Sequence, residues 1–236
     1  MGFRSGNRIL DALPAADAER LAPHARVLSL ERGQPTTQHD MVMRCVDFPL
    51  TALMSVSGTL ENGTTFELAS VGPEGFVEID AALDSKLALR SASCQFPGDV
   101  VRMPLEQFQA ALEYSRPFAR LARRAVRARV FVTEQSEMCN LRHTIVERLA
   151  RWLLVARERL GRDDFPVTHE FLATILGTRR AGVSEAAAVL QDRGAIVYQR
   201  GNVAIGGLEQ LAAASCECYE ACRAAIEETF ASGGER

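Results

Sequence analysis

The sequence has no run of about 18 consecutive apolar residues, the length that a membrane-spanning helix needs. Its first residues also lack the apolar stretch of a secretory signal peptide, so we expect a cytoplasmic protein without a membrane partner. Paired carboxylates, a Ser–His–Asp order and a glycine-rich phosphate loop do not stand out. We therefore expect no enzyme and no cofactor. Lysine is nearly absent as well, since Lys86 is the only one, and arginine carries almost all of the positive charge.

The six cysteines give no clear disulfide framework, because the chain is long and the expected compartment keeps thiols reduced. Three of them form a Cys-x-Cys-x3-Cys pattern at Cys216, Cys218 and Cys222. This pattern lacks a fourth ligand, so packing of a C-terminal amphipathic helix that also carries Leu208 and Phe230 explains it better than a metal site. We expect no metal. Redox sensing by a thiol stays open, and the four histidines are scattered.

The net charge of -3 hides an uneven distribution. Residues 116–162 carry 12 arginines against 4 acidic side chains, whereas the segments on both sides are acidic. A concentrated basic segment is compatible with a nucleic-acid partner even when the whole chain is slightly acidic.

Short apolar or alternating runs broken by turn residues fill the stretch from Val27 to Met103. Asn62-Gly63 lies between two such runs, and this dipeptide is a strong signal for a hairpin. Several short strands at this spacing predict an antiparallel barrel or roll, preceded by one helix from about Ile9 to Leu21.

The chain has no proline or glycine between Pro117 and Gly161, which predicts long helices. Thr144 and Glu147 fit a capping box, so we expect a break between Cys139 and His143 and a second helix after it. The first helix carries an apolar stripe at heptad spacing. The stripe predicts a two-stranded dimer seam, with packing against the chain's own β-domain as the alternative. Its residues are Phe118, Leu121, Ala125, Ala128, Val132, Gln135 and Cys139.

The segment from Thr168 to Ile205 has the pattern of a winged helix-turn-helix. Thr168 is a plausible N-cap, Gly177 ends the first helix, and a second helix follows from about Arg179 to Arg193. Strand, turn and strand then form a wing. The second helix would present its N-terminal end to base edges, while the first helix and the wing meet phosphates. The predicted DNA-contacting residues are Thr168, His169, Arg179, Arg180, Ser184, Glu185 and Arg200.

This order of roll, long helix and winged helix-turn-helix resembles the cyclic-AMP receptor protein and fumarate-nitrate regulator (Crp/Fnr) family over nearly the whole chain. The resemblance is strongest from Cys139-Asn140, through Arg148-Leu149-Ala150-Arg151-Trp152-Leu153-Leu154, to Cys216-Glu217-Cys218-Tyr219. It implies an α+β protein with an antiparallel, jelly-roll-like β-roll of the cyclic-nucleotide-binding-domain fold, a long dimerisation helix and a C-terminal winged helix-turn-helix. The expected boundaries are 1–115, 116–143 and 144–236, the last with a helical extension.

The resemblance further implies a homodimer that binds a two-fold-symmetric operator in double-stranded DNA and acts on RNA polymerase. Arg180 matches an arginine of the family's recognition helix. Ala181 and Glu185 depart from the pattern, so the half-site differs from that of the best-known members. An iron–sulfur form of the fold would need an N-terminal cysteine cluster, and the first cysteine here is Cys45.

The effector side departs further from the family pattern. Glu78, Arg90 and Ser91 echo the cassette that holds a cyclic nucleotide, but Val77 stands where the cassette has glycine, and a side chain there crowds the phosphate. We therefore predict a sequence-specific DNA-binding regulator whose effector is unknown or absent. The alternatives are a cyclic-nucleotide- or redox-responsive activator of the same family, and a sensory roll whose winged helix contacts a protein.

Overall fold

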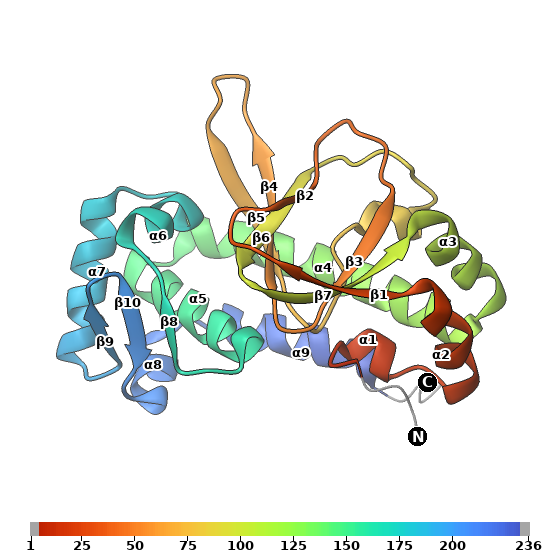
Figure 1. Cartoon of the computed structure of the whole chain (residues 1–236). Coiled ribbons are helices and arrows are strands. Elements are labelled where there is room, and N and C mark those ends of the chain that lie inside the picture. Colours follow the sequence, from red (N-terminus) through yellow and green to blue (C-terminus); the bar gives the residue numbers. More distant parts are fainter. Residues whose placement is uncertain (1–4, 232–236) are drawn as a thin grey trace. The chain divides into compact units, whose positions relative to one another are not determined.

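The computed structural model describes residues 5–231, which form two compact units (Figure 1). Of the described residues, the roll unit comprises 5–58, 68–131 and 225–231, and the winged-helix unit comprises 59–67 and 132–224. Among residues 5–231, none of the helices combines the length and the apolarity of a transmembrane span.

The roll unit opens with two short helices, α1 (Arg8–Asp11) and α2 (Ala15–Leu21), followed by the 3-10 turn η1 (Ala22–His24). The prediction of one helix from Ile9 to Leu21 is wrong, because Pro14 lacks a backbone N–H and disfavours helical backbone in the residue before it. The buried Asn7 caps α1 by accepting from the backbone N–H groups of Ile9 and Leu10. Its amide also donates to the carbonyl oxygens of Pro49 and Gly75, at 2.9 Å each.

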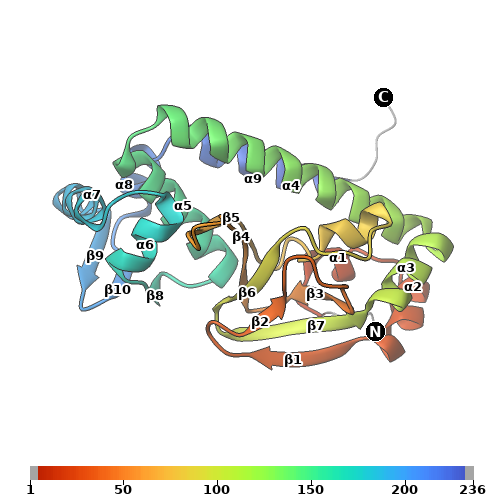
Figure 2. The ribbon, with the colours of Figure 1, turned by 90° about the horizontal axis from the view of Figure 1, so that it is seen from above.

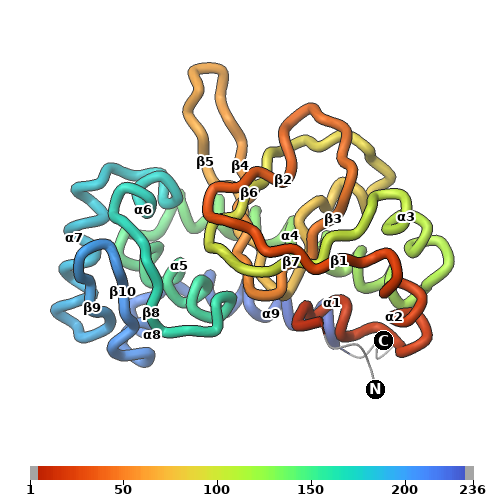
Figure 3. Tube along the Cα trace, viewed as in Figure 1, coloured from red at the N-terminus to blue at the C-terminus, as the bar shows by residue number. Residues whose placement is uncertain are grey.

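Two antiparallel sheets form the roll, as Figure 3 traces along the chain. The three-stranded sheet has the order β1-β7-β3, and the four-stranded sheet has the order β2-β6-β4-β5. The predicted hairpin is present between β4 and β5, and Gly63 there has a φ of 84°. The strands are β1 (Arg26–Leu30), β2 (Pro35–Thr37), β3 (Cys45–Pro49), β4 (Leu53–Thr59), β5 (Thr65–Val71), β6 (Ser91–Phe96) and β7 (Gly98–Pro104), with the 3-10 turn η2 (Ile79–Leu83) between β5 and β6.

Four buried phenylalanines form the centre of the roll unit's main core. Phe48 of β3 packs against Phe76, Phe108 and Phe118, with ring centroids 5.7, 6.1 and 6.4 Å away. Phe108 lies on α3 (Leu105–Tyr114), and Phe118 lies in the first turn of α4 (Arg116–Arg142). Each fully buried phenylalanine contributes about 1.5–3 kcal/mol by burial, so this cluster attaches the start of α4 to the roll.

The break after the long helix is confirmed. Helix α4 ends at Arg142, and α5 (Ile145–Leu160) begins with Thr144 as its N-cap. The Thr144 hydroxyl accepts from the backbone N–H of Glu147, whose carboxylate accepts from the backbone N–H of Thr144. This reciprocal capping box starts a new helix at that point.

The remaining elements complete a winged helix-turn-helix. In it, β8, β10 and β9 form a three-stranded sheet in that order beside the helices. The elements are β8 (Asp164–Pro166), α6 (His169–Leu176), α7 (Arg180–Asp192), β9 (Ile196–Gln199), β10 (Asn202–Ile205), α8 (Leu208–Ala214) and α9 (Cys218–Phe230). The structure thus has the predicted α+β fold class. The C-terminal segment holds two helices rather than one.

Candidate DNA-binding site

Helix α5 packs against the helix-turn-helix. Trp152 packs edge-on against Phe165 of β8 and Phe171 of α6, with ring centroids 6.4 and 6.2 Å away. The buried Arg148 donates from its guanidinium to the carbonyl oxygen of Leu176, the last residue of α6. A cation at this place complements the negative end of the helix dipole and satisfies a carbonyl that no later turn can reach. The sequence pattern did not single out Arg148 for this role.

The turn between α6 and α7 is built as predicted. Thr168 caps α6 by accepting from the backbone N–H of Phe171, and Gly177 ends α6 with a left-handed φ of 58°. Helix α7 then buries Val183, Ala187 and Leu190, which fixes the face that it turns outward.

That outward face carries three charged side chains near the start of α7. Arg179, Arg180 and Glu185 are exposed, and the side chain of none of the three makes a hydrogen bond or ion pair with another residue in the range 5–231. Charged side chains held at a helix N-terminus but left without partners can meet base edges or phosphates in a DNA groove.

His169 and Ser184, both predicted DNA contacts, are instead bonded to each other. The His169 Nδ1 atom lies 2.8 Å from the Ser184 Oγ atom, and the Ser184 hydroxyl donates to the carbonyl oxygen of Arg180 at 3.1 Å. The imidazole also stacks on Tyr198 of β9, with ring centroids 4.2 Å apart. Burial, together with the nearby charge of Arg180, lowers the pKa of His169. The neutral ring of His169 in α6 therefore contacts both Ser184 of α7 and Tyr198 of the wing, and it links these three elements.

The wing ends in a tight turn that presents Arg200. Arg200 and Gly201, the two residues between β9 and β10, have φ values of 48° and 78°. Positive φ at both central positions is the pattern of a type I′ hairpin turn, which suits the twist of the strands. Tyr198 anchors the base of the wing by donating its hydroxyl to the carbonyl oxygen of Val167 at 2.7 Å. Arg200 is exposed at the tip.

The predicted effector residues do not converge. Glu78 is buried and accepts from the Thr37 hydroxyl at 2.6 Å and from the Asp47 N–H at 2.9 Å. Arg90 is exposed and donates to the carbonyl oxygen of its neighbour Leu89, while the Ser91 hydroxyl accepts from the N–H of His39. The buried Val77 packs into an apolar cluster of the roll with Met54, Val71 and Val100.

The predicted seam residues on α4 are largely covered by their own chain. Phe118 and Leu121 lie in the main core of the roll unit, and Ala125 packs against it. Ala128 is buried, Val132 is half-buried, Gln135 donates to the Cys218 sulfur at 3.1 Å, and Cys139 is buried beside Cys216.

Helix α9 takes part in covering this face, and Figure 2 shows it running along α4. Arg124 of α4 donates to the carbonyl oxygen of Ala231 at 2.8 Å, and Arg127 pairs with Glu228 at 2.8 Å. Two arginines of the basic segment are thus engaged by the C-terminal helix. A different stripe of α4 is exposed, consisting of Val130, Phe131, Met138 and Leu141.

The geometry of residues 144–205 defines a winged helix-turn-helix DNA-binding domain. Residues 147–214 match the family model of the Crp-like helix-turn-helix domain. A search of curated proteins found no significant match.

Solved structures agree with this over most of the chain. A putative regulator of the Crp/Fnr family from Eubacterium rectale is 16% identical, with a TM-score of 0.65 over 88% of this chain and 97% of that one. FixK2 from Bradyrhizobium japonicum is 16% identical, with a TM-score of 0.68 over 81% and 98%. The c-di-GMP-responsive regulator CLP from Xanthomonas campestris is also 16% identical, with a TM-score of 0.64 over 82% and 100%. The chain thus has the fold of these Crp/Fnr transcription regulators, and within it residues 147–214 match the Crp-like helix-turn-helix domain, as the sequence resemblance predicted.

Proposed function

We propose that the protein is a homodimeric, sequence-specific DNA-binding transcription regulator that reads its half-site with the N-terminal end of α7. The observation that carries this proposal is that the exposed side chains of Arg179, Arg180 and Glu185 have no partner within residues 5–231, while the opposite face of α7 is buried. Arg180 is the candidate for a bidentate contact with guanine, and Glu185 can accept from cytosine. Thr168 and the wing residue Arg200 would meet phosphates on either side.

The proposal gives two of the predicted DNA contacts a supporting role. His169 and Ser184 act in the proposal as supports under Arg180, because their polar atoms already bind each other and the backbone.

Binding to a randomised DNA library, followed by titration of the selected site, tests the reading of DNA. We expect Arg180→Ala to weaken specific binding by about 1–3 kcal/mol and to relax the preference at one base pair. Arg193→Ala is the matched control, because Arg193 is an exposed arginine at the other end of the same helix. Equal loss in both variants, or wild-type protein with no sequence preference at any salt concentration, contradicts the proposal.

For the dimer we propose that the exposed stripe of α4 forms the seam with a second copy. Phe131, Met138 and Leu141 follow heptad spacing, which places them on one line along the helix. Leu141 is 82% exposed, Met138 52% and Phe131 37%, so the C-terminal part of this line is the least covered within residues 5–231. The predicted seam, by contrast, is covered by the chain's own core and by α9.

Sedimentation equilibrium tests the seam. Leu141→Glu places like charges opposite each other across a two-fold axis, and we expect dimerisation to weaken more than tenfold, since such contacts cost over about 1.4 kcal/mol. Leu208→Glu, at an exposed position on α8, is the control and leaves the association constant unchanged. A wild-type protein that stays monomeric at micromolar concentration contradicts this part.

We propose that residues 1–115 serve as the sensor, 116–143 as the dimer helix and hinge, and 144–236 as the DNA-binding part. The outermost residues, 1–4 and 232–236, lie outside the described residues. A cyclic nucleotide is not part of the proposal, because Val77 fills the roll and Arg90 does not meet Glu78. RNA polymerase is the proposed target, and transcription in vitro from a selected operator reports the sign of the effect.

A further inference from the structure

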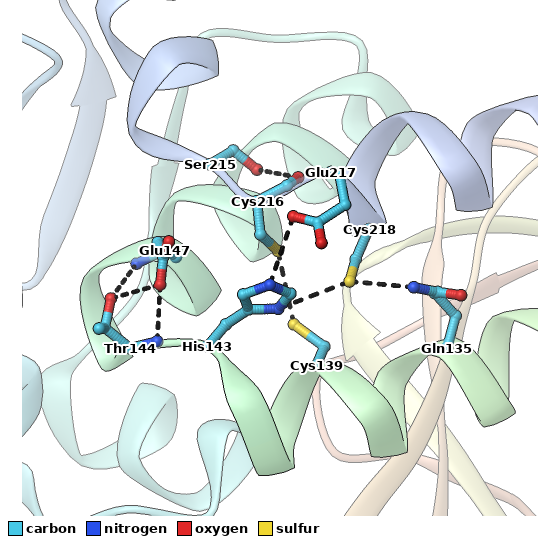
Figure 4. Close-up of polar contacts among 9 residues, drawn as sticks. All are labelled: Gln135, Cys139, His143, Thr144, Glu147, Ser215, Cys216, Glu217 and Cys218. Atoms are coloured by element: carbon cyan, nitrogen blue, oxygen red, sulfur yellow. Dashed lines mark hydrogen bonds and ion pairs between the residues drawn. The ribbon is translucent and has the colours of Figure 1, made fainter.

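Four side chains with metal-binding atoms meet in the winged-helix unit, away from the DNA-reading face of α7. They are Cys139, His143, Cys216 and Cys218, and Figure 4 shows them pointing toward one another. The sequence pattern offered no fourth ligand for the three C-terminal cysteines, but the structure places Cys139 and His143 beside two of them, Cys216 and Cys218. The fold brings two donors from the end of α4 to the junction of α8 and α9.

From this arrangement we propose a Cys3His site for one zinc ion, formed by these four residues. Cys139 and His143 are four residues apart, and the His143 N–H donates to the Cys139 carbonyl, so both side chains leave the same side of one helical turn. Cys216 lies in the short link between α8 and α9, and Cys218 is the first residue of α9. Two short motifs that are each too small to hold a metal thus become one complete set of four donors.

The distances fit a mononuclear tetrahedral site. The Cys139 and Cys216 sulfurs are 3.6 Å apart, the Cys218 sulfur is 3.6 Å from His143 Nδ1, and all four donor atoms lie within 4.8 Å of one another. Zinc–sulfur bonds of about 2.3 Å at tetrahedral angles place two sulfurs about 3.8 Å apart. A disulfide requires about 2.05 Å, and the cysteines here are free thiols. A four-iron cluster binds each thiolate to a different iron, which spreads the donors further than this group allows.

The donor types select zinc among common ions. Three thiolates and one imidazole are soft or borderline ligands, which suit zinc and disfavour magnesium and calcium. All four positions are taken by protein atoms, and the three sulfurs are buried, with exposures of 0% for Cys139, 6% for Cys216 and 1% for Cys218. A closed site of this kind is structural rather than catalytic.

Surrounding groups provide the second layer that metal sites require. His143 Nε2 lies 3.3 Å from the Glu217 carboxylate, which leaves Nδ1 facing the sulfurs and orients the ring as in carboxylate–histidine–zinc triads. Gln135 donates its amide N–H to the Cys218 sulfur at 3.1 Å, a hydrogen bond that a metal-bound sulfur can accept. Burial raises the pKa of the Cys139 thiol, and the nearby positive charge of Arg151 opposes that effect. Zinc with three thiolates carries one net negative charge, and Arg151 offsets it.

The bound ion would fix the hinge of the winged-helix unit. His143 directly precedes Thr144, the N-cap of α5, and α5 supports the helix-turn-helix. Zinc would therefore tie the last turn of α4 and the first residue of α9 to the residue from which α5 starts. Binding requires loss of the thiol protons, so it is weakened at low pH and reversed by chelators.

Metal analysis tests the site. The protein is tag-free, purified under reducing conditions and dialysed against buffer that contains trace zinc. We expect about one zinc per chain, as for a closed four-ligand site, and a cobalt-substituted form with thiolate-to-cobalt charge transfer and intense tetrahedral d–d bands. His143→Ala and Cys216→Ser should each lose the bound ion at least tenfold more readily to a competing chelator. Cys222→Ala is the matched control and should keep the ion, because Cys222 is a buried cysteine of α9 that lies outside the group.

Circular dichroism of each variant separates loss of the metal site from loss of the fold. His143→Cys is a second variant at this position, and it should retain zinc because it keeps four ligands. Protein that binds neither zinc nor cobalt while folded overturns the proposal. So does iron with inorganic sulfide in the purified protein, a Cys139–Cys216 disulfide that persists in reductant, or metal loss from Cys222→Ala equal to that from Cys216→Ser.

Discussion

His169 and Ser184 join the two helices of the helix-turn-helix through a contact of 2.8 Å between Nδ1 and Oγ. The Ser184 hydroxyl donates to the carbonyl oxygen of Arg180, so it accepts from an Nδ1–H of His169. The other ring nitrogen, Nε2, is buried without a partner among residues 5–231. If the contact with Ser184 is lost, the His169 ring therefore has no second hydrogen bond within these residues to hold it in place.

We expect Ser184→Ala to lower the free energy of unfolding by about 1–3 kcal/mol, because a part-buried imidazole N–H is left without an acceptor. Urea unfolding at pH 7 measures this change. Glu185→Ala, at the exposed neighbouring position, is the control and should change stability by less than about 0.5 kcal/mol. Equal stability of Ser184→Ala and the wild type would show that the contact does not stabilise the domain.

Gly182 makes a second, steric connection, this time between α7 and α5. A Cβ atom at Gly182 would lie 2.9 Å from the Cδ1 atom of Ile145. Alanine is favoured over glycine inside a helix by about 1 kcal/mol, and the clash opposes that gain.

A double-mutant cycle separates the two effects. Gly182→Ala should change stability little in the wild-type background, and it should stabilise the Ile145→Val background by about 1 kcal/mol, because valine lacks the obstructing Cδ1 atom. Thermal unfolding of the four proteins measures the coupling. Additive changes would mean that Ile145 can move aside at no cost.

Glu78 gives the roll unit a pH dependence of defined sign. Burial, reinforced by the negative charge of Asp47, raises the pKa of Glu78 from its ordinary value of 4.5 to about 8. Asp47 itself is held by a bidentate pair with Arg102 at 2.7 Å. The folded protein therefore binds a proton at Glu78 that the unfolded chain has released between these two pH values.

Because the folded state holds the extra proton, this contribution to stability is complete below about pH 4.5, falls as the pH rises and is lost above about pH 8. Glu78→Gln removes the titration, and its amide can still accept from the Asp47 N–H and donate to the Thr37 hydroxyl. The free energy of unfolding, measured at several pH values from 5 to 9, should change less with pH for Glu78→Gln than for the wild type. Glu61→Gln, on the exposed hairpin, should leave the wild-type slope unchanged.

Local signals predicted the DNA-binding segment well. Thr168 and Gly177 define the ends of α6 through interactions with their immediate neighbours, and Thr144 with Glu147 does the same for the start of α5. Such contacts depend on residues a few positions apart, so the sequence contains them directly.

Contacts between distant segments were not predictable in this way. Cys139 and Cys216 are 77 positions apart, and only the packing of α9 along α4 brings their sulfurs together. The apolar stripe on α4 was recognised from its period, but period alone does not say whether a face meets a partner chain or the chain's own core. Phe118 and Leu121 meet the core.

Arg200 sits at the wing tip with a φ of 48°, a conformation that asparagine or glycine adopts more easily than arginine. A directed-evolution selection for heat resistance alone should therefore recover asparagine or glycine at this position, whereas a selection for operator binding should restore arginine. The two selections favour different residues at the same position. At position 200, a substitution that stabilises the turn is therefore expected to weaken DNA recognition.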